Sequence, residues 1–401
     1  MIIMSNKKFD AIIAGHVCLD LTPKFDIHGK AVSEVLRPGK LVEAGECCIS
    51  LGGPVSNTGI AMSILGQDVA LMCKVGKDMF GRIVSEKITE YGTDKIIALD
   101  DEEETSYTVA VVIPGNDRIF LHDPGANRNF GAEDVDYAQV EDCRLFHFGY
   151  PPQMRRVYLN NGAELTEIFK RAKAAGATTS LDMAQPDPNS EGGKQDWNTI
   201  LKNTLPFVDI YIPSVEETMF MLYPEMFDEF RRVHANENDP LETMDANILP
   251  VLGEKLLEYG AKIAVIKCGV RGYYIRTADK LEGFGAVAPS DLEEWSGREI
   301  ICESFHVDNI QSATGSGDSS IAGFLSSFLN GAGIYDCLET ACAVGSRNLT
   351  ALDALSGIKT MEETHELMKT LTKNVYSYDE AYWTRDEKTG LIFGKCDKTQ
   401  K

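Results

Sequence analysis

The feature that most constrains the fold is a glycine-rich turn, ATGSGD at residues 313–318, followed directly by an apolar helical pattern. Ile321, Phe324, Leu325 and Phe328 recur at i, i+3, i+4 and i+7, which predicts one buried helical face. The unpaired N–H groups at a helix N-terminus carry about half a positive charge and bind anions. The sequence therefore predicts a helix whose first turn faces an anionic ligand.

Anion binding by this turn does not explain the presence of Asp318, because a carboxylate repels a phosphate. Gly315 and Gly317 let the backbone approach an anion without Cβ clashes. In this position Asp318 would act as the general base for a hydroxyl that attacks a phosphoryl group, whose charge the N–H groups stabilise. The alternative is an ordinary helix N-cap, a position that Asp and Ser favour. The turn taken alone leaves both interpretations open.

Charge and composition argue against several classes of partner. The chain has 401 residues and a net charge of −22, which argues against binding to nucleic acid or to an anionic membrane surface. No apolar run approaches the ~20 residues that span a bilayer. The seven histidines show no metal-ligand spacing, and the ten cysteines include no C-x-x-C pair. The first residues lack a signal-peptide pattern, so we expect reduced thiols and a cytoplasmic location.

Two motifs in the first part of the chain are candidates for ligand binding. Asp20 follows the first apolar strand, and open α/β sheets bind ligands beyond the ends of such strands. Asp20 is therefore a candidate for hydrogen bonds to a polyol, with a solvated turn residue as the equal alternative. Gly52 and Gly53 precede a helix predicted over residues 55–65, where Asn57 in the first turn can donate and accept hydrogen bonds.

Strands and helices alternate along most of the chain, which predicts an α/β fold with a mostly parallel sheet and helices on both faces. A hairpin predicted at about residues 105–123 interrupts this alternation, and we expect it to form a lid or a dimerisation flap. Residues 224–247 and 284–300 have little pattern and are interpreted as insertions. Residues 376–401 are interpreted as a polar C-terminal tail that follows a domain of residues 1–375.

Taken together, these segments resemble the ribokinase family, also called the PfkB family of carbohydrate kinases. The resemblance covers about residues 9–357, in the order that the family has. It rests on two signature regions and several shorter matches: GGPVSN at 52–57 with KVGKDMFG at 74–81, TGSGD at 314–318 with AGF at 322–324, GAN at 125–127, PSVEE at 213–217, and IKCGVRG at 266–272. It implies a ribokinase-like three-layer α/β/α fold with a mostly parallel central sheet and a small β lid.

The resemblance also implies an activity, the ATP-dependent transfer of a phosphoryl group to a hydroxyl of a sugar-like molecule, with Mg²⁺. By position, Asp318 would be the base, and the backbone of Gly315, Ser316 and Gly317 would form the anion hole. The lid would also pair two subunits, so we expect a homodimer.

The same resemblance assigns the ligand-binding residues. Asp20, Gly52, Gly53 and Asn57 would hold the sugar. The nucleotide would be bound on the side of Lys267, Gly269, Gly272 and Asn348. Glu217 would organise Mg²⁺ through its waters.

Three departures from the family pattern indicate a divergent member. Ser214 stands where the N-x-x-E motif has Asn, and its shorter side chain reaches less far toward the metal and its waters. Ser312 and Ala313 replace an Asp-Thr pair whose Asp is often used by potassium-activated relatives, so we expect weak or absent dependence on a monovalent cation. The run DMA at residues 182–184 replaces the familiar Asp-Pro-Asn.

Two alternatives stay open at this point. A nucleoside kinase of the same fold would use the same turn. A catalytically silent regulator that binds sugar or nucleotide is compatible with Ser214 and Ser312, although the retention of Asp318 argues against it. A dinucleotide oxidoreductase is excluded, because Ser320 occupies the third glycine position of G-x-G-x-x-G and the motif lies far from the N-terminus. The sequence does not identify the acceptor.

Overall fold

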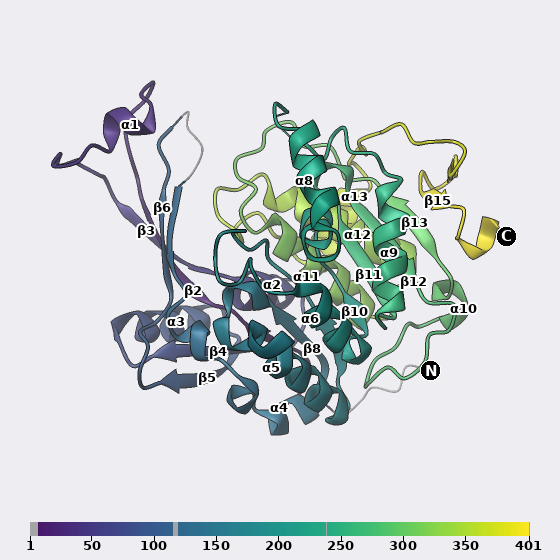
Figure 1. Ribbon diagram of the computed structural model, residues 1–401, viewed down its shortest axis with the longest axis horizontal. Coiled ribbons are helices and arrows are strands. Elements are labelled where there is room, and N and C mark those ends of the chain that lie inside the picture. Colours follow the sequence, from purple (N-terminus) through teal and green to yellow (C-terminus); the bar gives the residue numbers. More distant parts are fainter. Residues whose placement is uncertain (1–6, 115–118, 238, 401) are drawn as a thin grey trace.

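The structure is a computed structural model that describes residues 7–114, 119–237 and 239–400. Within them, eleven strands form one sheet in the order β14-β15-β13-β12-β11-β10-β9-β8-β1-β4-β5 (Figure 1). The parallel strands are β5 (Asp94–Asp100), β4 (Val69–Gly76), β1 (Phe9–Gly15), β8 (Cys143–Gly149), β9 (Thr178–Leu181), β10 (Ile210–Tyr211) and β11 (Ile263–Lys267). The antiparallel strands are β12 (Tyr273–Thr277), β13 (Glu299–Cys302), β15 (Ile392–Gly394) and β14 (Trp383–Arg385). The predicted α/β class with a mostly parallel sheet is confirmed.

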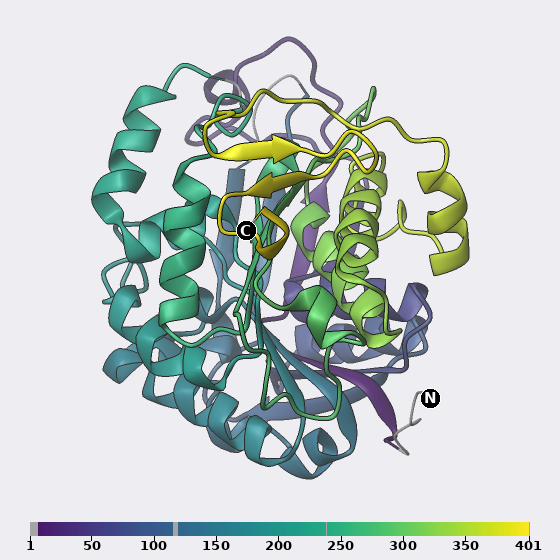
Figure 2. The same ribbon diagram turned by 90° about the vertical axis from the view of Figure 1, so that its right-hand side faces the viewer.

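Helices cover both faces of this sheet, which gives three layers (Figure 2). One face packs against α2 (Pro54–Ile64), α3 (Met79–Glu90), α11 (Ser316–Leu329), α12 (Ile334–Asn348) and α13 (Met361–Met368). The other face packs against α4 (Tyr137–Glu141), α5 (Arg155–Ala174), α6 (Trp197–Thr204), α7 (Val215–Leu222), α8 (Pro224–Val233) and α9 (Ile248–Glu258). In the described ranges, no helix is long and apolar enough to cross a membrane.

Strand β1 shows why the sheet needs a helical layer on each face. Ile12 and Ala14 are buried in the core beneath α5, whereas Ala11 and Ile13 are buried in the core beneath α2 and α11. Successive side chains of a strand point to opposite faces, so a strand with a run of apolar residues such as 11–14 requires cover on both.

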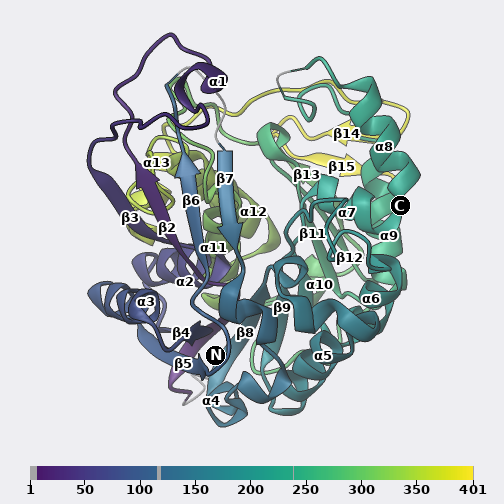
Figure 3. The ribbon, with the colours of Figure 1, turned by 60° about the vertical axis from the view of Figure 1, so that its left-hand side comes forward.

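A second sheet of four strands forms the lid and rises beside β4 and β5 (Figures 1 and 3). Its order is β3 (Cys47–Gly52), β2 (Cys18–Pro23), β6 (Tyr107–Val111) and β7 (Ile119–Asp123). The predicted hairpin is therefore half of the lid, and its turn falls on residues 115–118, outside the described residues. Asp20 lies in β2 and not in a turn, and the stretch between β2 and β3 contains the short helix α1 (Val32–Val35). The predicted small β lid is confirmed.

Three stretches that the sequence pattern led us to interpret as insertions or as a polar tail are packed into the domain. Residues 224–247 contain α8, whose two phenylalanines are buried three residues apart. Residues 284–300 contain α10 (Leu292–Trp295) and the start of β13, with Trp295 fully buried. Residues 376–401 supply β14 and β15 to the large sheet, so they are not a free tail. In each stretch the few buried side chains have polar neighbours in the sequence, so the hydrophobic periodicity cannot be recognised.

A buried ion pair attaches the C-terminal strands to the sheet. The Arg298 guanidinium donates to the Asp397 carboxylate at 2.9 Å, and the side chains are 2% and 0% exposed. The same carboxylate accepts the backbone N–H of Glu299 at 2.9 Å. The end of the chain is thereby joined to β13.

Replacing Asp397 with alanine is expected to destabilise the protein by about 3–5 kcal/mol, because Arg298 is left as a buried cation without its partner. Urea unfolding followed by circular dichroism measures this change. The control is Asp228→Ala on the exposed side of α8, expected within about 0.5 kcal/mol of the parent. Equal stability of the two variants would contradict the role given to the pair.

Candidate active site

Two hydrogen bonds hold the Asp318 side chain in the first turn of α11. Asn57 Nδ2, in the first turn of α2, donates to Asp318 Oδ2 at 2.8 Å, and the Tyr150 hydroxyl donates to Oδ1 at 2.9 Å. Asp318 is 3% exposed. Burial raises the pKa of its carboxyl, and the bonds from Asn57 and Tyr150 act against that rise. A fixed carboxylate with a raised pKa is suited to accept a proton from a hydroxyl.

The two helices converge because each begins immediately after a glycine in the left-handed region. Gly53 before α2 has φ 89°, and Gly315 before α11 has φ 72°. A Cβ on Gly315 would lie 2.4 Å from the Cβ of Ala354, so a larger residue does not fit. These sharp turns bring both helix N-termini to the same edge of the sheet, where Asn57 and Asp318 meet.

The first turn of α11 presents free backbone donors. Among the described residues, the N–H groups of Gly317 and Asp318 have no acceptor, whereas the N–H of Ser319 bonds to a carbonyl at 2.8 Å. The nearest neighbour of a Cβ built on Gly317 would be the Lys267 side chain, 3.6 Å away, so the backbone here is open. Unpaired N–H groups at a helix N-terminus bind anions. The geometry therefore fits a phosphate beside the Asp318 carboxylate.

Lys267 approaches this edge from the end of β11. Its Nζ donates to Asp182 Oδ1 at 2.5 Å and to the Ile212 carbonyl at 2.7 Å. Burial lowers the pKa of the ammonium, but the carboxylates of Asp182 and Glu217 outweigh burial and raise the pKa overall. Lys267 is therefore a cation, and it adds positive potential beside the open backbone of Gly317.

Glu217 is held at the start of α7 by a capping box with Ser214. The Ser214 hydroxyl accepts the N–H of Glu217 at 3.2 Å, and Glu217 Oε2 accepts the N–H of Ser214 at 2.6 Å. Within the described ranges, Asp182, Glu217 and Asp318 do not form a group close enough to hold a metal ion by themselves. Since Mg²⁺ keeps several waters and binds substrate phosphates, this arrangement fits an ion held mainly by a nucleotide.

The residues that were predicted to bind the sugar lie at the same end of the sheet as Asp318. Asp20 in β2 faces Gly52 in β3 so closely that a Cβ on Gly52 would lie 2.3 Å from Asp20 Oδ2. A Cβ on Gly53 would lie 2.6 Å from the His16 carbonyl. Burial raises the pKa of Asp20. The ring centroids of His16 and Tyr150 are 6.3 Å apart, which links this group to the Asp318 carboxylate.

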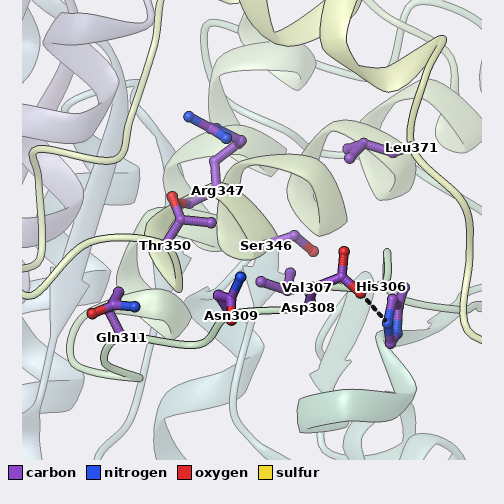
Figure 4. Close-up of a pocket in the computed structure, with 9 residues that line it drawn as sticks. All are labelled: His306, Val307, Asp308, Asn309, Gln311, Ser346, Arg347, Thr350 and Leu371. Carbon is purple, nitrogen blue, oxygen red and sulfur yellow. Dashed lines mark hydrogen bonds and ion pairs between the residues drawn. The ribbon is translucent and has the colours of Figure 1, made fainter.

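A cavity of about 380 Å³ lies between the loop after β13 and the end of α12. It is lined by His306, Val307, Asp308, Asn309, Gln311, Ser346, Arg347, Thr350 and Leu371 (Figure 4). Asn348, predicted to contact the nucleotide, is fully buried and donates to the Ala354 carbonyl at 2.6 Å. Gly269 and Gly272 form the turn between β11 and β12 and do not line this cavity.

Sequence reasoning missed Tyr150, His306 and Arg347. Tyr150 follows β8 with φ 63°, a conformation that is uncommon for a tyrosine and that marks functional sites in many proteins. Its hydroxyl reaches a residue 168 positions later in the chain, a contact that no local pattern indicates. The available signal was the run GYPP at residues 149–152, which ends a strand with a tyrosine before two prolines.

Residues 13–361 match the profile of the pfkB family carbohydrate kinases. An uncharacterized sugar kinase of Archaeoglobus fulgidus is 24% identical over 75% of this chain and 98% of its own length. A 5-dehydro-2-deoxygluconokinase of Geobacillus thermodenitrificans is 22% identical over 90% of this chain and 94% of its own.

Solved structures are similar in fold. An Arabidopsis thaliana ribokinase complexed with ribose and ATP has a TM-score of 0.66 at 16% identity, covering 90% of this chain and 99% of that one. A putative ribokinase II from E. coli, in complex with ATP and Mg²⁺, has a TM-score of 0.64 at 19% identity with the same coverage. At these identities the likeness concerns the fold.

Replacing Tyr150 with phenylalanine is expected to raise the pKa of Asp318 further, because the carboxylate loses a hydrogen bond that stabilises its charged form. A ¹³C NMR titration of labelled aspartate carboxyls measures this, with the Asp318 signal assigned by its loss in Asp318→Asn. The control is Tyr211→Phe, since the buried Tyr211 hydroxyl has no partner among the described residues. An unchanged Asp318 midpoint in Tyr150→Phe would contradict the geometry described above.

Proposed function

The chain belongs to the pfkB family of carbohydrate kinases, and we propose that Asp318 is the base that prepares the hydroxyl of a sugar-like acceptor for phosphorylation by ATP. The observation that carries this proposal is the buried carboxylate, fixed by Asn57 and Tyr150, beside unpaired N–H groups of a helix N-terminus. Transfer of a phosphoryl group to an alcohol needs a base and an anion site next to each other.

Each residue of the site has a separate task in this mechanism. Asp318 accepts the hydroxyl proton as the acceptor oxygen approaches phosphorus. The N–H groups of Gly317 and Asp318 and the Lys267 cation stabilise the negative charge on the phosphoryl oxygens. Asn57 and Tyr150 keep the carboxylate oriented. The lid covers the acceptor and excludes water, which would otherwise compete for the phosphoryl group.

The nucleotide is assigned to the side of α11 that is opposite the lid. The cavity beside His306 and Arg347 takes the base and ribose, and the first turn of α11 takes the phosphates. Lys267 lies near the phosphates, and Gly269 and Gly272 shape the turn that follows β11. Glu217, whose Oε2 caps α7, would hold the waters of a Mg²⁺ ion, which would neutralise phosphate charge.

The chemical class of the acceptor is inferred from the charges of the side chains around its proposed position. The polar side chains around the acceptor position are carboxylates, an amide, hydroxyls and the imidazoles of His16 and His122. Burial lowers the pKa of both imidazoles, to about 3 for His16, so they are neutral at pH 7. The described cations of this region are paired, Lys267 with Asp182 and Arg128 with Asp123 and Glu103. This environment favours an uncharged polyol over a sugar acid, whose carboxylate would meet no free positive charge.

We also propose that the lid pairs two subunits. Ile119 and Leu121 alternate on one face of β7 and are 37% and 58% exposed, and Ile49 in β3 is 40% exposed. Apolar side chains on an edge strand favour contact with a second chain. We assign this face to a homodimer, which sedimentation of the purified protein tests.

Replacing Asp318 with asparagine is expected to lower kcat by about 10²–10⁴-fold, because the base is lost while the size of the side chain is kept. The dissociation constant for ATP is expected to stay within about twofold of the parent, since the backbone N–H groups are unchanged. An ATP-consumption assay and calorimetry measure the two effects, with Asp228→Asn as the surface control. Near-normal turnover of Asp318→Asn would remove Asp318 from its role.

A panel of acceptors tests the proposed class. Ketoses and aldoses are expected to be phosphorylated with kcat/KM at least about tenfold above that of the matching sugar acids, because the pocket offers the carboxylate no free cation. Nucleosides are included to test the alternative acceptor class. Preference for a sugar acid would overturn the assignment of a neutral acceptor. Binding of sugars without ATP consumption would identify a silent regulator instead.

A further inference from the structure

Three potential metal ligands meet where the lid joins the large sheet. They are His16 between β1 and β2, Cys18 at the start of β2, and His122 in β7. One ligand atom from each lies within 4.8 Å of the others, and no other group of three such residues is this close in the described part of the chain. The mechanism above gives the sulfur and the two ring nitrogens no chemical step.

The His16 side chain is the independent sign of a missing partner. It is 2% exposed, and neither of its ring nitrogens has a hydrogen-bond partner. A buried polar group without a partner is costly, and a native structure keeps few of them. The ring of His16 lies 5.3 Å from that of His122, centroid to centroid. Burial keeps both imidazoles uncharged at pH 7, which is the form that binds a metal.

The neighbours of these side chains complete the environment of an ion. The Thr108 hydroxyl lies 3.0 Å from Nδ1 of His122 and 3.6 Å from the Cys18 sulfur, so it can orient both ligands. The Cys18 sulfur donates to Asp20 Oδ1 at 3.2 Å, so a carboxylate lies beside the cluster, although Asp20 is not one of the three grouped ligands. Two nitrogens and one sulfur form a donor set that suits Zn²⁺, with a water as the fourth ligand.

Ion binding would hold the three ligand atoms at the separations that Zn²⁺ requires. Zn–N bonds of about 2.0–2.1 Å and a Zn–S bond of about 2.3 Å place tetrahedral ligands about 3.3–3.6 Å apart. The ligand atoms here lie within 4.8 Å of one another, so any pair near that limit would move closer by about 1 Å when an ion binds. His122 is in the lid and partly exposed, whereas His16 and Cys18 are buried at the end of the large sheet. Metal binding would therefore draw the lid onto the sheet.

We propose that His16, Cys18 and His122 form a binding site for a thiophilic divalent cation, Zn²⁺ in the first place, and that the bound ion closes the acceptor pocket. On binding, the Cys18 thiol loses its proton to solvent and its sulfur bonds to the ion. Asp20 then faces the ion in place of a sugar hydroxyl. The competition between the bound ion and the acceptor rests on the proposed function, whereas binding of the ion does not.

Equilibrium dialysis of the reduced, ATP-free protein against ZnCl₂, with the metal counted by mass spectrometry, tests the site directly. One Zn²⁺ per chain is expected, with affinity reduced at least about tenfold in Cys18→Ser and in His122→Ala. The matched control is Cys48→Ser, an exposed cysteine in β3 outside the cluster, which is expected to bind as the parent does. His122→Ala changes an exposed lid residue, so its folding is not at risk, and circular dichroism verifies it.

Cobalt supplies a spectroscopic test of the ligands. Co²⁺ bound at this site is expected to show a thiolate charge-transfer band that Cys18→Ser removes and Cys48→Ser keeps. Absence of metal binding by the parent would overturn the proposal. So would binding that depends on Cys48 and not on Cys18 or His122.

Kinetics with excess MgATP test the competition. Zn²⁺ is expected to raise the KM for the acceptor in the parent and not in His122→Ala. Because ATP binds the same amount of Zn²⁺ in both assays, the variant also controls for that loss of free Zn²⁺. An equal effect on both proteins would overturn the competition. The dialysis experiment decides the metal site even if no acceptor is turned over, so failure of the site and failure of the proposed function give different results.

Discussion

The hydrogen bond from the Asn57 amide to the Asp318 carboxylate is the contact on which the rest of the site depends. It joins the first turns of α2 and α11, two helices whose sequences lie 261 residues apart. Each helix begins after a glycine that turns the chain sharply, so both positive ends face one buried carboxylate. That field favours the ionised form of Asp318, while burial opposes it, and the balance leaves a base beside an anion site.

A strongly acidic chain can bind phosphate only where local fields outweigh the net charge of −22. Here the local field comes from the open N–H groups of the α11 turn and from the Lys267 ammonium, which Asp182 and Glu217 keep charged. On the acceptor side, the described cation Arg128 is paired with Asp123 and Glu103. The proposed function thus divides the site into a positive nucleotide side and an acceptor side without a free cation, and it places the lid over the second.

Much of this arrangement could be predicted from the sequence, because it is encoded locally. The glycine turns, the helical spacing after Gly315 and the strand–helix alternation each depend on neighbouring residues; they identified the fold and made Asp318 a candidate base. Tyr150 could not be found in this way, since its contact depends on a left-handed backbone at the end of β8. The two histidines of the lid cluster showed no motif because His16, between β1 and β2, and His122, in β7, are 106 residues apart and only the fold brings them together.

Short strands set the other limit on prediction. β14 and β15 have three residues each, and a period of two cannot be recognised over that length. Their place in the sheet is fixed instead by the buried pair of Arg298 and Asp397, a long-range contact between polar residues that resemble surface residues in the sequence. Tertiary contacts between polar groups are therefore where the sequence analysis failed, both in the tail and at Tyr150.

The central claim is that Asp318 takes the proton of the acceptor hydroxyl while the α11 turn holds the phosphoryl group. A crystal structure with a turned-over sugar and a non-hydrolysable ATP analogue tests it most directly. The account predicts the acceptor hydroxyl about 2.6–3.2 Å from an Asp318 carboxylate oxygen, with the terminal phosphate on the N–H groups of Gly317 and Asp318. An acceptor hydroxyl that faces another side chain, or a terminal phosphate bound away from that turn, would contradict it.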